Sequence, residues 1–113
     1  MSKSAQRARL WHREGGRCWY CDRPTRLGGA VTAGCFATVD HPMPLARGGT
    51  DDDTNRVCCC FRCNQAKGAL TEAEFRSMST VDAIRFNDAV KMHGLGNMTI
   101  IEVAMAAGRQ AAA

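Results

Sequence analysis

Two pairs of cysteines have the spacing of metal ligands. Cys18 and Cys21 form one Cys-x-x-Cys unit, and Cys60 and Cys63 form a second. Two intervening residues allow both sulfurs of a unit to reach one ion, and tetrahedral zinc is commonly held by four thiolates. The spacing therefore predicts a structural zinc site. A four-thiolate site has no open position for a substrate, so it accounts for folding and leaves any catalysis to other residues.

Three further cysteines, Cys35, Cys58 and Cys59, bring the total to 7. An odd number of cysteines in a chain that we expect to be intracellular argues against a disulfide framework. Cys58 and Cys59 compete with Cys60 as ligands, but the Cys-x-x-Cys spacing favours Cys60. We interpret the three surplus cysteines as core thiols, and their use in a zinc–thiolate redox sensor is a separate hypothesis.

A second group of residues has side chains suited to acid–base and metal chemistry. In chain order the group is Asp40-His41-Pro42, Gly48-Gly49, Asn55, and Asn64 directly after Cys63. Together with the cysteine pairs this order resembles the HNH endonuclease family, and the resemblance covers about residues 18–68. Zinc ribbons share the cysteine pairs but have no need of the other residues.

The resemblance implies a fold and a reaction. The fold is α+β: a ββα-metal (His-Me finger) core with structural zinc, in which a β-hairpin packs on a helix, flanked by further helices. The reaction is metal-dependent hydrolysis of phosphodiester bonds in DNA. His41 would be the general base, because imidazole titrates near neutral pH. Asn55 would hold the loop after His41 through hydrogen bonds to the backbone, since an amide both donates and accepts.

The resemblance also implies a catalytic metal. Asp40 and Asn64 would be its ligands, because both offer the hard oxygen atoms that Mg²⁺ or Mn²⁺ prefers. Asn64 stands where the family name has its last His, which makes this an HNN variant. The site resembles those of the phage Holliday-junction resolving endonuclease and of the HNH domain of RNA-guided CRISPR nucleases. Arg47 and Lys67 are the expected contacts to DNA phosphates.

Apolar spacing, capping residues and helix breakers predict the elements that position these residues. In chain order we expect a helix over 3–14, a strand over 36–39 ending near His41, a loop over 42–53 with a brief strand near 45–47, helices over 54–68, 71–78 and from Ser79 or Thr80 to His93, a strand or helix start over 98–103, and a frayed tail over 104–113. The expected packing residues are Phe75, Met78, Val81, Ile84, Phe86 and Val90. Asp51-Asp52-Asp53 is expected to cap a helix rather than to bind metal.

Length and composition set the remaining expectations. With 113 residues, 15 Lys+Arg and 11 Asp+Glu, the chain has a net charge of +4 and is expected to form one domain over 1–113. The motif core would occupy about 18–68 and a helical extension about 71–113. Without a long apolar run, the protein is expected to be cytoplasmic and not in a membrane.

Several alternatives stay open at this point. The expected partner is DNA. A double-strand break would need two sites, which leaves a homodimer possible, and the resemblance to small phage proteins adds a phage packaging partner. The main alternative function is a non-catalytic zinc-knuckle module that binds nucleic acid or protein through the basic helix over 3–14.

Overall fold

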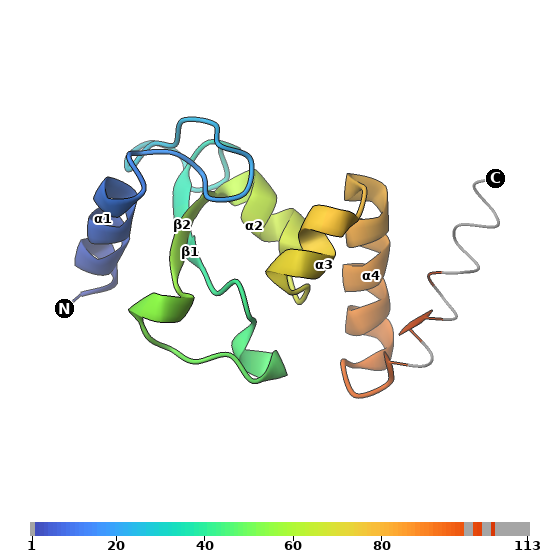
Figure 1. Cartoon of the computed structure of the whole chain (residues 1–113). Helices are drawn as coiled ribbons and strands as arrows, with labels where there is room; N and C mark the ends of the chain where they lie inside the picture. Colours follow the sequence, from blue (N-terminus) through green and yellow to red (C-terminus); the bar gives the residue numbers. More distant parts are fainter. Residues whose placement is uncertain (1, 99–100, 103–104, 106–113) are drawn as a thin grey trace. The chain divides into compact units, whose positions relative to one another are not determined.

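The computed structural model describes residues 2–98, 101, 102 and 105. The chain divides into two compact units, Met1–Gln65 and Ala66–Ala113. The first unit contains helix α1, the strands β1 and β2 and most of helix α2, and the second contains α3 and α4 (Figure 1). No helix within the described residues has the length and apolar character that crossing a membrane requires.

Helix α1 (Lys3–Arg13) opens the first unit and confirms the helix expected over 3–14. The Ser2 hydroxyl caps it by accepting a hydrogen bond from the backbone N–H of Ala5 at 3.1 Å. Its buried residue, Leu10, packs with Ala37 of β1 and Cys58 of β2. The helix is therefore fixed against one face of the strand pair.

The strands β1 (Ala37–Asp40) and β2 (Val57–Cys60) form an antiparallel pair, and Ala37 lies opposite Cys60. The strand expected over 36–39 is confirmed, and so is the β-hairpin that the family resemblance implied. The single helix expected over 54–68 is wrong in its first half. All four residues of β2 are buried, and β1 supplies the hydrogen-bonding partner that the local pattern does not reveal.

Two 3₁₀ turns connect the strands. The first, η1 (Leu45–Arg47), replaces the brief strand expected there, because Gly48 closes the segment in the left-handed region at φ 92°. The second is η2 (Asp53–Asn55), and the Asp52 side chain caps it by accepting from the N–H of Thr54 at 3.0 Å. The capping role expected of the acidic run is thus filled by Asp52.

Helix α2 (Phe61–Lys67) follows β2 without a break. Its first free N–H groups are used by the segment before β1: Phe61 donates to the carbonyl of Phe36 at 2.9 Å, and Arg62 donates to that of Gly34 at 3.3 Å. This junction places Cys60 at the end of a strand and Cys63 and Asn64 on a helix.

The second unit confirms two predicted helices. Helix α3 (Glu72–Ser77) has the capping box formed by Thr71 and Glu74, and α4 (Thr80–His93) is capped by Ser79. The buried core of the second unit consists of Leu70, Ala83, Phe86, Ala89, Ile101 and Met105. Phe75, Met78 and Val90 pack against these residues.

Two expected packing residues of the second unit are wrong. Val81 and Ile84 are 56% and 49% exposed, because α4 turns Ala83, Phe86 and Ala89 inward instead. Residues 98, 101, 102 and 105 are helical, which favours the helical alternative for 98–103. Residues 99, 100 and 103, and all of the expected tail except Met105, lie outside the described residues.

Candidate functional site

The four predicted zinc ligands come together in the first unit. The sulfurs of Cys18, Cys21, Cys60 and Cys63 all lie within 4.8 Å of one another, and those of Cys21 and Cys60 are 3.9 Å apart. A tetrahedral ion with zinc–sulfur bonds of about 2.3 Å needs sulfurs about 3.8 Å apart. The donor set and its spacing therefore fit a structural zinc ion.

Backbone N–H groups support the two cysteine turns. Tyr20 and Cys21 direct theirs at the sulfur of Cys18, at 3.4 and 3.5 Å, and Cys63 directs its own at the sulfur of Cys60, at 3.4 Å. A hydrogen bond from the Cys63 thiol, together with these N–H groups, lowers the pKa of Cys18. Since zinc binds thiolates, hydrogen bonds to sulfur favour the ligating form.

Cys58 and Cys59 are completely buried and lie outside the metal cluster. Burial raises the pKa of Cys58 to about 11 and also raises that of Cys59. Both are neutral thiols at neutral pH and pack in the core of the hairpin, as the interpretation of the sequence expected. Cys35 is only half-buried.

Asp40 and Asn64 belong to the same face of the hairpin. Side chains alternate along a strand, so Thr38 and Asp40 point to the face opposite Ala37 and Val39, which pack with α1. The Asn64 amide nitrogen donates to the Thr38 hydroxyl at 2.9 Å. This contact brings the α2 residue to the strand that carries Asp40.

The ligand atoms of this pair suit a hard divalent ion. Because the Asn64 nitrogen donates to Thr38, the amide oxygen is the atom of this side chain that could bind a metal ion. The Asp40 carboxylate accepts a hydrogen bond of 2.6 Å from the Tyr20 hydroxyl, so a residue of the first cysteine turn orients it. One carboxylate and one amide oxygen fit Mg²⁺ or Mn²⁺, which keep water and substrate oxygens as their other ligands.

His41 follows β1 directly and is partly exposed. Its Nε2 lies 2.9 Å from Asp51 Oδ1, and Arg56 donates to the same carboxylate oxygen from Nη2 at 2.9 Å and from Nε at 3.2 Å. Hydrogen bonds from His41 and then Arg56 lower the pKa of Asp51. The imidazole is therefore held beside an ionised carboxylate.

Asn55 joins both ends of the loop after His41. Its Oδ1 accepts from the N–H of Met43 at 3.0 Å, and its Nδ2 donates to the carbonyls of Met43 and Thr50, both at 2.8 Å. Gly49 passes so close that an added Cβ would lie 1.9 Å from the Met43 oxygen. Both hydrogen-bonding atoms of the Asn55 side chain contact backbone groups, so Asn55 shapes the loop.

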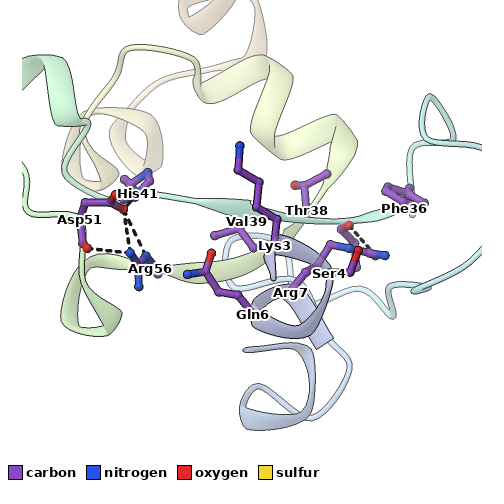
Figure 2. Close-up of a pocket in the computed structure, with 11 residues that line it drawn as sticks. Lys3, Ser4, Gln6, Arg7, Phe36, Thr38, Val39, His41, Asp51 and Arg56 are labelled. Carbon is purple, nitrogen blue, oxygen red and sulfur yellow. Dashed lines mark hydrogen bonds and ion pairs between the residues drawn. The ribbon is translucent and has the colours of Figure 1, made fainter. Parts of the chain in front are cut away.

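A groove of about 570 Å³ runs along β1 and ends at His41. Figure 2 shows His41, Asp51 and Arg56 gathered at one end and Phe36 at the other, with side chains of α1 between them. Lys3 and Gln6 also line the groove. The Arg7 guanidinium donates to the carbonyls of Leu27 and Ala37 and lies over the Phe36 ring. The lining includes three permanent cations, Lys3, Arg7 and Arg56, against one carboxylate, Asp51.

The two expected phosphate contacts differ in exposure. Arg47 ends η1 and is half-buried. Lys67 has no exposed surface, so a phosphate does not reach it in this structure. The α1 cations of the groove were not singled out as phosphate contacts from the sequence, nor was Asp51 paired with His41. The signals for them were a basic first helix and an acidic residue ten positions after the histidine.

Comparison with known proteins places this arrangement in a family. Residues 18–70 match the family model described as HNH endonuclease. The chain is also similar to the CRISPR-associated endonuclease Cas9 1 of Streptococcus thermophilus, with 30% identity over 78 residues, which are 69% of this chain and 7% of that relative. The match covers the hairpin, the four cysteines and α2. The segment over residues 18–70 therefore belongs to the HNH endonuclease family.

Proposed function

We propose that this protein is a metal-dependent DNA endonuclease that uses His41 as general base and one divalent ion held by Asp40 and Asn64. The observation that carries the proposal is the contact of 2.9 Å between Asn64 and Thr38, because it brings the last residue of the motif to the strand that bears Asp40 and leads to His41. The family membership of residues 18–70 supports a nuclease.

The reaction follows from the groups at the site. His41 takes a proton from a water molecule, whose oxygen forms a bond to phosphorus as the bond from phosphorus to the 3′-oxygen breaks. The leaving 3′-oxygen takes a proton from solvent, and the products are a 5′-phosphate and a 3′-hydroxyl. Asp40 and Asn64 would hold Mg²⁺ or Mn²⁺, which when bound offsets the negative charge developing on the phosphate and leaving oxygen.

The groove along β1 is the proposed path of the cleaved strand. Its cations give it a net positive lining, and phosphate contacts position DNA without reading its sequence. Lys3 is exposed at this groove, so we assign it a phosphate contact, and the half-buried Arg47 remains a second candidate. One such site cuts one strand, so the expected product of a single encounter is a nick.

Cleavage of supercoiled plasmid by the zinc-loaded protein tests the proposal. Nicked circles are expected with added Mg²⁺ or Mn²⁺, and none when the zinc-loaded protein is assayed without an added divalent ion. Asp40→Ala and Asn64→Ala are expected to lose cleavage while keeping their zinc. Asp88→Ala, a change at an exposed residue of α4, is the matched control and is expected to cut normally. Absence of cleavage with every metal, by a folded zinc-loaded protein, would contradict the proposal.

A further inference from the structure

We propose that Asp51 is a positioning residue for His41, and that Arg56 holds Asp51 in place for this task. The inference rests on the proposed function, since it deepens the role of His41. The contact that suggests it is the distance of 2.9 Å between His41 Nε2 and Asp51 Oδ1. It joins the residue after β1 to a residue ten positions later in the connecting loop.

The chemistry of the two groups fixes which ring nitrogen can act as the base. An ionised carboxylate only accepts hydrogen bonds, so Nε2 of His41 must carry the proton of this contact. In a neutral imidazole the other nitrogen, Nδ1, is then the unprotonated one. Asp51 therefore selects the tautomer in which Nδ1 receives a proton from water. The same carboxylate stabilises the positive ring that forms once the proton has been taken.

Arg56 makes this arrangement rigid. The Asp51 side chain is 64% exposed and would move freely if nothing held it, whereas the Arg56 side chain is only 17% exposed. Arg56 donates twice to the carboxylate oxygen and once, at 2.6 Å, to the main-chain oxygen of Asp51. Arg56 is itself anchored by Arg13, whose guanidinium donates to its carbonyl at 2.5 Å. The support of the base thus extends from the loop to α1.

The neighbouring acids have different partners and supply the control. Asp52 caps Thr54, and Asp53 binds Arg9 and Arg56. Asp51→Ala and Asp52→Ala each remove one negative charge from the same loop, but only Asp51→Ala removes the contact to His41. A difference between these variants therefore reports the loss of the Asp51 side-chain contacts, to His41 and Arg56, and not the change of charge near DNA.

The first readout is independent of cleavage. Long-range ¹H–¹⁵N correlation spectra of the histidine side chains are recorded at pH 8 on zinc-loaded full chain without Mg²⁺. In wild type and in Asp52→Ala, His41 is expected to carry its proton on Nε2. In Asp51→Ala, the signals are expected to move toward a mixture of tautomers, while His12 and His93 stay unchanged as internal references. A wild-type His41 with its proton on Nδ1 would overturn the inference.

The second readout is steady-state cleavage of a labelled DNA duplex. Because acid–base steps contribute about 10²–10⁴-fold, loss of the orienting carboxylate is expected to lower kcat by about tenfold or more in Asp51→Ala, with KM changed less than about twofold. Asp52→Ala is expected to keep kcat within about twofold of wild type. The two variants can therefore be told apart by the fall of about tenfold or more expected for Asp51→Ala. Equal kcat values for the two variants, or a higher kcat for Asp51→Ala, would overturn the inference.

The two readouts separate this inference from the proposed function. If wild type cuts no DNA with any metal, the proposed function fails. The spectra then still decide whether Asp51 fixes the tautomer of His41.

Discussion

Removal of the Asn55 side chain tests how the loop after His41 is held. Asn55→Ala deletes three hydrogen bonds to backbone, one to the N–H of Met43 and two to the carbonyls of Met43 and Thr50. Each such bond contributes about 0.5–1.5 kcal/mol net, which sums to about 1.5–4.5 kcal/mol. Water reaches the exposed partners Met43 and Thr50 in the variant, so we expect the lower part of this range, about 2 kcal/mol.

Thermal unfolding of the zinc-loaded protein measures this loss. For a unit of this size about 2 kcal/mol corresponds to a fall in Tm of about 8–16 °C. Asn55→Asp is the isosteric control: it keeps the acceptor for Met43 N–H but directs a carboxylate oxygen at two carbonyls, so its Tm is expected to fall as well. Cleavage is expected to fall with both variants, because the loop positions His41. A Tm of Asn55→Ala within about 2 °C of wild type would refute the reasoning.

Three further predictions concern zinc, DNA and the second unit. Cys63→Ser is expected to lose zinc and cooperative unfolding, whereas Cys35→Ser keeps both; elemental analysis and calorimetry measure this, and a zinc-loaded Cys63→Ser would contradict it. Lys3→Glu is expected to weaken DNA binding and to reduce the slope of log K against log salt by about 0.9, whereas Lys91→Glu, the same charge change on α4, leaves the slope unchanged. Asn87→Ala is expected to destabilise the protein by about 2–4 kcal/mol in urea unfolding, since Asn87 accepts from Ala69 N–H and donates to the carbonyls of Ala66 and Lys67. Unchanged unfolding would show that water replaces these bonds without loss.

Elements with strong local signals were predictable from the sequence. Thr71 and Glu74 form the capping box that their spacing indicates, and Ser79 and Gly94 bound α4 as expected. β1 ends at Asp40, just before His41 and Pro42, because proline lacks the N–H that a continuing strand would need. In each case the residues that decide the structure are close in the sequence.

Strand β2 was missed because its cause is distant in the sequence. Val57–Cys60 contains no helix breaker, so the local pattern favours continuing a helix through it. The strand forms because Cys58 lies opposite Val39 of β1 and because α1 covers the Cys58 face with Leu10. Tertiary burial overrides local propensity here.

The candidate site shows the same division between local and distant causes. The motif residues are recognisable from their order, but the partners of Asp51, Asp52 and Asp53 are not, since three identical neighbours diverge only through the geometry of the turn. Lys67 lies one turn beyond Asn64, which predicts a phosphate contact, yet its side chain is wholly buried. Whether a single charged side chain is buried depends on tertiary packing, so the local sequence pattern does not predict it.

Comparison of His41→Ala with His12→Ala tests the central claim most directly. Both variants remove one imidazole from the same unit, but His12 is exposed on α1 and lies outside the groove. The measurement is plasmid nicking with Mg²⁺ or Mn²⁺, made alongside the zinc content and Tm of each protein. Wild type and His12→Ala are expected to nick the plasmid, whereas His41→Ala, folded and with its zinc, is not. Nicking by His41→Ala at the wild-type rate would contradict it.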